Sequence, residues 1–484
     1  MNYKQVGYII SLLLLMEAAF MITPLAISFA LAEHAAIRGY IASIAIIVIT
    51  AGIMYWFCRD RKGGFYAKEG MVLTGLAWII MSMLGCLPFY ISGEIPRYVD
   101  ALFEVVSGFT TTGSSILTNV EALDKGLLFW RSFTHWVGGM GVLVFLMAIV
   151  PLSGKNGGFT LHILRAESPG PSVGKLVPKM KKTASILYLI YVILTVLDLI
   201  FLLIGGMPLF DAVCTAFGTA GTGGFGVRND SLAGYSPYLQ NVTTVFMLLF
   251  GVNFSCYYLL ILKSFKEVFR DEELRLYCLI VFSSIALIAW NIHGMYANVG
   301  EAVHHSAFQV ASIISTSGFA TADFDLWPNF SKAILLLLMI FGACAGSTGG
   351  GIKTIRLLLL VKSLKRNIHQ QIHPNRISHI RVNGAVIDEK VITNVGVYLI
   401  AYTMIIIVSF LIVSLDGFSV EANVSAVLAT FNNIGPGLAE VGPTCNFYAY
   451  STLSKIVMIF GMLAGRLEIM PVIVLLSRQT WKKV

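Results

Sequence analysis

Four short polar stretches in an otherwise apolar sequence carry residue types that can bind dehydrated cations. Each combines Thr, Ser or Asn with glycine, and the first reads GFTTTGSS at 108–115. Backbone carbonyl oxygens can replace the hydration shell of a monovalent cation, and glycine permits the unusual dihedrals that aim several carbonyls inward. The candidate cation-binding residues are Thr111, Thr112, Gly113, Thr222, Gly223, Gly224, Thr316, Ser317, Gly318, Asn433, Ile434 and Gly435.

The four stretches occupy equivalent positions in an internal repeat. Each follows an amphipathic run, and when Gly113, Gly224, Gly318 and Gly435 are aligned, a second glycine follows 24 to 27 residues later in every unit. Gly223 is an alternative centre for the second unit, but the sequence GGF there matches SGF in the third and favours Gly224. The pattern predicts four units of span, short helix, loop and span.

The short amphipathic runs cannot cross a membrane. A helix of about 12 residues rises only about 18 Å, whereas the hydrocarbon core is about 30 Å thick. Each run must therefore enter and return on one face, and its non-helical loop must be buried in protein or line a water-filled cavity. Asp100 and Asp211, near the starts of the first two runs, are expected to cap these helices rather than to bind ions. The four loops are predicted to meet around one axis and to line a pore.

Composition identifies a polytopic membrane protein. Of 484 residues, 56% are hydrophobic and 12% are charged, which is far more apolar than a soluble domain. No cleavable signal peptide is expected, because the first apolar run is too long. Ten spans are predicted, at 7–31, 39–57, 71–92, 127–151, 184–206, 238–262, 275–293, 331–361, 392–415 and 453–477.

Charge predicts the orientation of the chain. Most Lys and Arg residues fall in 59–68, 155–182, 263–275, 362–390 and 478–484, which all lie on one side if ten spans alternate. The positive-inside rule places this side, with both termini, in the cytoplasm. The opposite side is acidic, which would concentrate cations at an outer mouth. Depletion of basic residues outside explains the same asymmetry equally well.

The predicted fold class is an all-α polytopic membrane protein with four span, re-entrant helix and span repeats around one pseudo-four-fold pore. Two extra N-terminal helices precede the repeats. The predicted divisions are a two-helix N-terminal domain at 1–69 and pore repeats at 70–155, 184–265, 274–365 and 391–484.

Two features of the later spans interrupt the apolar pattern. The eighth span contains the segment GACAGSTGGGIK, which is too rich in glycine for one uninterrupted helix. We expect a loop at the pore axis, with a packing kink as the alternative. The tenth span carries Arg466, whose charge should face a cavity or a partner such as a carboxylate elsewhere in the fold. The residues of the interrupted segment are Gly346, Ser347, Thr348, Gly349, Gly350, Gly351 and Lys353, of which Lys353 is expected to point into the pore or toward the cytoplasm.

The four loops in register, the two extra N-terminal helices and the stretch GACAGSTGGGIKTIR resemble the TrkH family, the membrane subunits of the bacterial Trk potassium uptake system within the Trk/Ktr/HKT superfamily. The resemblance covers the whole chain. It implies a potassium pathway through one chain, a homodimer in the lipid bilayer of the bacterial inner membrane, and a cytosolic nucleotide-binding regulatory subunit of TrkA type. It further implies that the segment at 346–353 is the gate and that Arg466 is a positive barrier below the filter. In related plant transporters a Ser at the first filter glycine goes with sodium permeation, so Gly113 implies a preference for potassium.

Other functional classes find little support in the sequence. Residues 221–226 match G-x-G-x-x-G, but they follow a membrane helix and lack a βαβ unit, so they predict no dinucleotide site. We found no nucleophile and base pair and no metal-ligand spacing, so we expect no enzyme activity, no organic cofactor and no nucleic-acid partner. Potassium is the expected ligand. The alternative is a proton- or sodium-coupled secondary cation transporter, which would show inverted repeats and two interrupted spans in matching halves.

Overall fold

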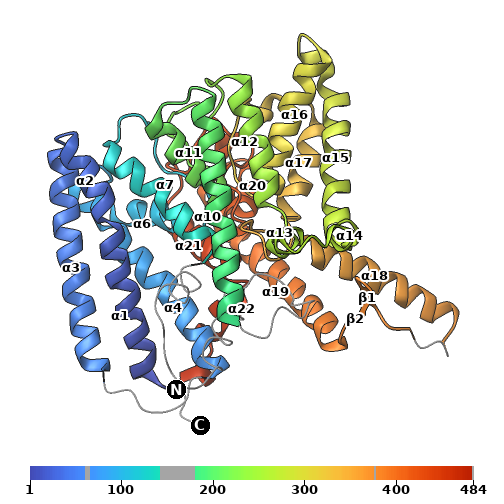
Figure 1. The fold of residues 1–484 in the computed structure, drawn as a ribbon, viewed down its shortest axis with the longest axis horizontal. Coiled ribbons are helices and arrows are strands. Elements are labelled where there is room, and N and C mark those ends of the chain that lie inside the picture. Colours follow the sequence, from blue (N-terminus) through green and yellow to red (C-terminus); the bar gives the residue numbers. More distant parts are fainter. Residues whose placement is uncertain (60–65, 142–179, 375–377, 482–484) are drawn as a thin grey trace.

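The computed structural model describes residues 1–59, 66–141, 180–374 and 378–481. Within these residues the chain is predominantly helical, with one small hairpin of two strands (Figure 1). The helices up to residue 270 are α1 (Tyr3–Phe20), α2 (Ile22–Ala30), α3 (His34–Cys58), α4 (Ala67–Gly85), α5 (Leu87–Ser92), α6 (Tyr98–Phe109), α7 (Lys125–Gly139), α10 (Met180–Ile204), α11 (Leu209–Gly221), α12 (Pro237–Phe250), α13 (Phe254–Ile261) and α14 (Phe265–Arg270).

The second half continues the same pattern of long and short helices. The hairpin pairs Arg381 with Val386 and Val382 with Ala385 in antiparallel register. The remaining elements are α15 (Glu272–Ile292), α16 (Val299–Ile314), α17 (Asn329–Ile340), α18 (Thr354–Ile372), β1 (Arg381–Val382), β2 (Ala385–Val386), α19 (Glu389–Val413), α20 (Val420–Phe431), α21 (Thr452–Arg466), α22 (Met470–Leu476) and α23 (Arg478–Trp481), with short 3-10 turns at His293–Met295, Phe324–Leu326, Ser414–Asp416 and Ala439–Val441.

The long helices confirm a multi-pass membrane protein. Six segments among the described residues are long and apolar enough to span a bilayer, and a seventh is added if α12 and α13 count as one bent span. The six segments are Tyr3–Ala30, His34–Cys58, Ala67–Ser92, Ser185–Ile204, Glu272–Met295 and Glu389–Asp416. They correspond to the first, second, third, fifth, seventh and ninth of the ten predicted spans.

The second spans of the second, third and fourth predicted repeats are divided. The span predicted at 238–262 is divided, because α12 and α13 meet at a bend of 90°. The break predicted within 331–361 is confirmed, since α17 ends at Ile340 and α18 begins at Thr354. For the span predicted at 127–151, α7 ends at Gly139, and positions from 142 onward lie outside the described residues.

The tenth predicted span is also divided, which the apolar pattern over 453–477 did not indicate. Leu467, Glu468 and Ile469 separate α21 from α22, and both Glu468 and Ile469 have positive φ. The N–H of Ile469 donates to the carbonyl of Ala464 at 2.7 Å, which closes the end of α21. A left-handed conformation at a β-branched residue is costly, so the surrounding packing must hold this turn.

The core joins the two ends of the sequence. The largest buried cluster includes side chains from α1, α3, α4, α6 and α7 together with α20 and α21. At one end of the molecule Tyr3 stacks on Trp481 with ring centroids 6.4 Å apart, and the Tyr3 hydroxyl donates to the Trp481 carbonyl. The N-terminal helix and α23 therefore lie together at the same end of the molecule (Figure 1).

Candidate functional site

The four short helices α6, α11, α16 and α20 end in loops with the same backbone signature. Thr111, Thr222, Thr316 and Asn433 have φ values between 54° and 61°, and the glycine two positions later also has positive φ. These glycines are Gly113 at 82°, Gly224 at 74°, Gly318 at 80° and Gly435 at 107°. The second unit therefore places Gly224, and not Gly223, at the equivalent central position. Glycine adopts this conformation without the penalty that a Cβ carries.

The four loops touch one another in cyclic order. A Cβ built on Gly113 would overlap the carbonyl oxygen of Gly223 in the second loop, and one on Gly224 would overlap that of Ser317 in the third. In the same way the third loop contacts the fourth, and the fourth contacts the first. A Cβ on Gly318 would overlap the Ile434 carbonyl, and one on Gly435 would lie 3.1 Å from the Thr112 carbonyl oxygen. Close contact with neighbouring backbone thus requires glycine at positions 113, 224 and 318 in addition to φ, and at Gly435 the contact is tight.

Direct hydrogen bonds join the first and fourth loops. The Ser114 hydroxyl donates to the Gly435 carbonyl at 2.9 Å, and the Asn433 side-chain amide donates to the Thr112 hydroxyl at the same distance. The Asn433 amide also donates to the Met462 carbonyl of α21 at 3.0 Å. The bonds of Ser114 to Gly435 and of Asn433 to Thr112 link residues 321 positions apart, so the ends of the predicted repeat series are joined to each other.

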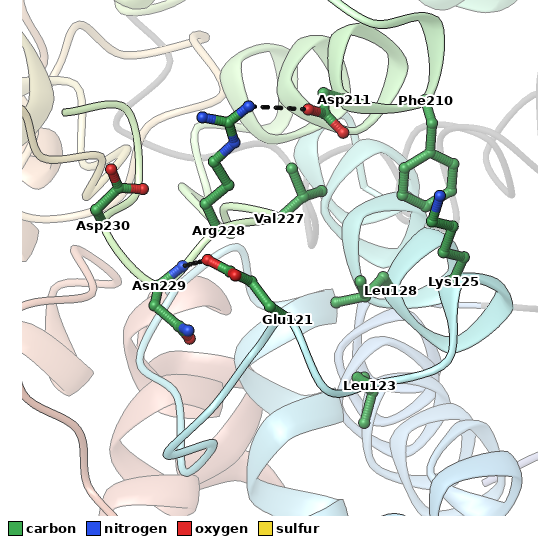
Figure 2. Close-up of a pocket in the computed structure, with 10 residues that line it drawn as sticks. All are labelled: Glu121, Leu123, Lys125, Leu128, Phe210, Asp211, Val227, Arg228, Asn229 and Asp230. Carbon is green, nitrogen blue, oxygen red and sulfur yellow. Dashed lines mark hydrogen bonds and ion pairs between the residues drawn. The ribbon is translucent and has the colours of Figure 1, made fainter. Parts of the chain in front are cut away.

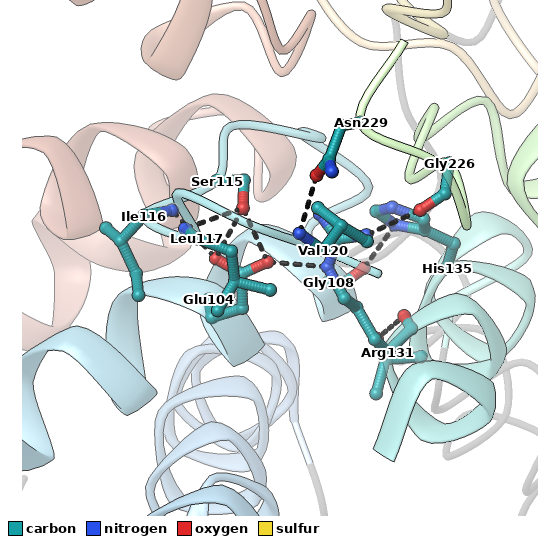
Figure 3. A network of polar contacts seen from close by, with 11 residues as sticks. Glu104, Gly108, Ser115, Ile116, Leu117, Val120, Arg131, His135, Gly226 and Asn229 are labelled. Atoms are coloured by element: carbon teal, nitrogen blue, oxygen red, sulfur yellow. Dashed lines mark hydrogen bonds and ion pairs between the residues drawn. The ribbon is translucent and has the colours of Figure 1, made fainter. Parts of the chain in front are cut away.

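A buried ion pair positions the first two loops (Figure 3). Arg131 of α7 donates to Glu104 of α6 at 2.6 Å, with side-chain exposures of 4% and 0%. Glu104 also accepts the Ile116 N–H at 2.9 Å, which fixes the segment that follows Gly113. Arg131 donates to the Gly226 carbonyl at 3.0 Å, and its guanidinium lies 3.5 Å from the centroid of the Phe225 ring. A fully paired buried charge of this kind is costly to disrupt, because the remaining partner would lie unpaired in the interior.

The segment between α17 and α18 packs directly against the third and fourth loops. The Gly350 N–H donates to the Thr316 hydroxyl at 2.6 Å. A Cβ on Gly349 would lie 2.9 Å from the Ser315 carbonyl oxygen, and one on Gly350 would overlap the Asn432 carbonyl. The sequence-predicted interruption is therefore a compact loop beside the residues that precede the central glycines, and the packing-kink alternative does not describe it.

Lys353 folds back on this loop. Its ammonium donates to the carbonyls of Gly349 and Gly350, and the residue is only 2% exposed. The expectation that Lys353 could extend toward the cytoplasm is wrong, because its side chain satisfies carbonyls within its own loop. A buried ammonium held by carbonyls adds positive charge to the loop's interior.

Arg466, at the last position of α21, joins the loop to another part of the fold. Its guanidinium donates to the Thr348 carbonyl of the loop at 2.7 Å. It also donates to the carbonyls of Gly138 and Gly139, at the end of α7, at 2.6 Å and 2.7 Å. Glu468, two residues on, pairs with Arg356 of α18 instead. Arg466 thus places a positive charge among backbone carbonyls next to the interrupted span.

Comparison with known proteins shows to which family the chain belongs. The family model for TrkH, described as a cation transport protein, matches residues 37–483. The chain belongs to the TrkH family. It is 33% identical to the Trk system potassium uptake protein TrkH of Escherichia coli K12 over the full length of both chains, and 32% identical to TrkG of the same strain over 99% of each. The crystal structure of the potassium transporter TrkH from Vibrio parahaemolyticus superposes with a TM-score of 0.88 at 30% identity, covering 100% of both chains.

Within this member of the TrkH family, Asp100 and Asp211 do not serve as the predicted helix caps. The N-cap positions of α6 and α11 are Arg97 and Pro208, and both aspartates lie in the first helical turn. The Asp100 carboxylate instead pairs with Lys455 of α21 at 2.7 Å. Asp211 accepts the hydroxyl of Tyr235 at 2.7 Å. An acidic group in the first turn of a helix still interacts favourably with the helix dipole. Asp100 and Asp211 are therefore expected to stabilise the starts of α6 and α11, although they do not cap them.

Sequence reasoning missed the two buried ion pairs. Arg131 and Lys455 are single charges inside apolar stretches, and such residues usually mark a partner or a cavity. That signal was available from the sequence. The identity of their partners, Glu104 and Asp100, depends on how the short helices pack and could not be read from spacing alone.

An open pocket of mixed charge lies where the first two units meet (Figure 2). It has a volume of about 500 Å³ and includes Glu121, Asp211 and Asp230 as well as Lys125 and Arg228. Arg228 lies 4.0 Å from the Asp211 carboxylate, and the Asn229 N–H donates to Glu121 at 3.0 Å. Three carboxylates against two cationic groups leave the pocket with an excess of acidic side chains.

Proposed function

We propose that the chain carries potassium into the cell through a selectivity filter formed by the four glycine-centred loops. The observation that supports this best is their cyclic contact, from Gly113 to Gly223, Gly224 to Ser317, Gly318 to Ile434 and Gly435 to Thr112. Four backbone segments of the same conformation around one axis can present converging carbonyl oxygens to a dehydrated cation. The names of the relatives, which are potassium uptake proteins and a potassium transporter, agree with potassium as the ion.

The loop at 346–351, together with Lys353, is proposed as the gate. It lies against Ser315, Thr316 and Asn432, which precede the central glycines of the third and fourth loops. A loop in this position would block an ion leaving the filter, and it would have to move for conduction. Its glycine content supports movement between two positions, since glycine tolerates the required changes in backbone dihedrals. The hydrogen bond from Arg466 to the Thr348 carbonyl would hold the loop in the blocking position.

Arg466 is proposed as a positive barrier below the filter. Its charge is held by carbonyls of the loop and of α7, so that it stands beside the passage rather than at the lipid. A cation passing such a charge in a medium of low dielectric is repelled unless water and oxygen atoms screen it. The barrier would slow ions that the filter has already selected.

Membership of the TrkH family supports a proposal for the assembly and its location. We propose a homodimer in the bacterial inner membrane with both chain ends in the cytoplasm, regulated by a cytosolic nucleotide-binding subunit of TrkA type. The proximity of Tyr3 to Trp481 supports placing both ends on one side. The basic residues of the predicted cytoplasmic segments support the orientation. The predicted divisions at 1–69, 70–155, 184–265, 274–365 and 391–484 remain our proposal for the repeat boundaries.

Purified protein in proteoliposomes provides the test. We expect uptake of K⁺ and Rb⁺ to exceed that of Na⁺ and Li⁺ under equal gradients. Uptake that proceeds without a proton or sodium gradient favours a channel, whereas uptake that depends on one supports the coupled transporter. Equal permeation of all four ions would contradict the proposed filter.

A further inference from the structure

The two ends of the proposed gate loop are held by one carboxylate. Glu273, in the first turn of α15, accepts the N–H of Ala345 at 2.6 Å and the N–H of Ile355 at 3.1 Å, both through Oε1. The residue is only 5% exposed. Ala345 precedes the glycine-rich stretch 346–351 and Ile355 follows it, so the contact joins positions on either side of the proposed moving part.

The chemistry of the contact makes it stronger than an ordinary hydrogen bond. Ile355 is the second residue of α18, whose first N–H groups have no partner within the helix. A carboxylate at a helix N-terminus gains from the helix dipole as well as from the hydrogen bond. Glu273 therefore acts as a cap supplied by α15 to a helix whose second residue lies 82 positions later in the chain.

The base of the loop is closed by backbone hydrogen bonds as well. The Gly342 N–H donates to the Ile352 carbonyl at 2.9 Å, and the Thr354 N–H donates to the Ala343 carbonyl at 3.1 Å. The N–H of Phe254, the first residue of α13, donates to the Gly346 carbonyl at 3.0 Å. The loop is thus a closed turn, and a contact at its base controls how the whole turn sits against the filter loops.

We propose that Glu273 is a positioning residue that clamps both ends of the loop and holds it in the blocking position. The proposal rests on the proposed function of 346–351 as a gate. With the carboxylate in place, the start of α18 and the start of the loop share one anchor. Without it, the N–H groups of Ala345 and Ile355 lose their common partner, and the loop departs from the filter residues more often.

The neighbouring acid supplies a matched control. Glu272 belongs to the same helical turn, but its carboxylate pairs with Lys362 and accepts the N–H of Asn383 in the hairpin. No hydrogen bond joins Glu272 to 342–352 among the contacts of the described residues. Substitution of Glu272 therefore removes a carboxylate from the same turn of α15 without releasing the loop.

Amide hydrogen exchange across 342–352 in the full-length protein, reconstituted in lipid nanodiscs, tests the clamp without depending on transport. We expect exchange in Glu273→Ala to be about tenfold faster than in the unmodified protein, because a buried hydrogen-bonded charge is lost. Glu273→Gln should give a smaller acceleration, since its amide oxygen can still accept one N–H. Glu272→Ala and Glu272→Gln should leave exchange in this segment unchanged.

Two outcomes would overturn the proposal. One is unchanged exchange in 342–352 for Glu273→Ala, and the other is an equal acceleration in the Glu272 variants. If Glu273→Ala does not fold, the comparison of Glu273→Gln with Glu272→Gln decides in the same way, and equal exchange in the two contradicts the clamp.

Rb⁺ uptake by the same variants separates the clamp from the gate. We expect Glu273→Ala to raise uptake and to reduce its dependence on the regulatory subunit, while Glu272→Ala leaves both unchanged. Faster exchange in 342–352 with unaltered uptake would support the clamp and contradict the proposed gating role of the loop.

Discussion

Replacement of Arg466 by Gln removes a charge from the proposed pathway while keeping a hydrogen-bond donor at the same place. Two unit charges about 6 Å apart at an effective dielectric constant of 20 interact by roughly 3 kcal/mol. The three carbonyls that accept from Arg466 offset part of this repulsion. If they offset half, about 1.5 kcal/mol remains, which corresponds to about a tenfold change in rate. We therefore expect Arg466→Gln to raise Rb⁺ uptake about tenfold.

Arg466→Lys provides the matched control, because it keeps the positive charge but loses the planar guanidinium. In the unmodified protein that group donates to carbonyls of both the loop and α7. Lys presents a compact ammonium that cannot reproduce the spread of the guanidinium contacts. The connection from the loop at Thr348 to Gly138 and Gly139 should weaken, whereas the electrostatic barrier should persist. Uptake by the Lys variant should remain close to that of the unmodified protein.

The assay is Rb⁺ uptake into proteoliposomes at equal protein density, with the melting temperature measured on each purified variant. Arg466→Ala should resemble Arg466→Gln in uptake, and the preference for K⁺ over Na⁺ should change little, because selection takes place in the filter. An increase in Arg466→Lys as large as that in Arg466→Gln would show that the hydrogen bonds, and not the charge, restrain transport. A lower melting temperature in all three variants with no gain in uptake would refute the barrier.

Three further predictions address the gate, a buried pair and a close backbone contact. Deletion of several residues within 345–351 should raise K⁺ flux and loosen its dependence on the regulatory subunit, and reduced flux in well-folded protein would argue for a purely structural loop. Lys455→Met leaves the Asp100 carboxylate buried without its cation and should cost about 3–5 kcal/mol of stability, seen as a large drop in melting temperature. A Cβ at Gly465 would overlap a carbonyl oxygen of α20, whereas nothing lies within 4 Å of one at Gly52, so Gly465→Ala should be strongly destabilising and Gly52→Ala should not.

The register of the four loops could be predicted from sequence because glycine has a direct conformational role there. The match of GGF in the second unit to SGF in the third favoured Gly224, and its φ of 74° is positive like those of Gly113, Gly318 and Gly435. The break near 346–351 was also predictable, since a dense run of glycine disfavours a helix for reasons local to the backbone.

Other breaks had no comparable local signal. The bend between α12 and α13 occurs in a run with a single glycine, Gly251, and the turn after α21 places Glu468 and Ile469 at positive φ. Neither residue type favours that conformation, so packing decides it. The hydrogen bonds of Arg466 to the loop and to α7 likewise depend on how separate repeats meet, which the sequence pattern does not specify.

The permeability ratio of K⁺ to Na⁺ in a Gly113→Ser variant tests the central claim most directly. A Cβ at Gly113 would overlap the carbonyl oxygen of Gly223 and disturb the contact between the first two loops. Gly93 supplies the control, because its φ of 87° carries the same backbone strain but nothing lies within 4 Å of its Cβ position. We predict that Gly113→Ser narrows the preference for K⁺ while Gly93→Ser retains it. An unchanged ratio in folded Gly113→Ser protein would contradict the assignment of these loops as the filter.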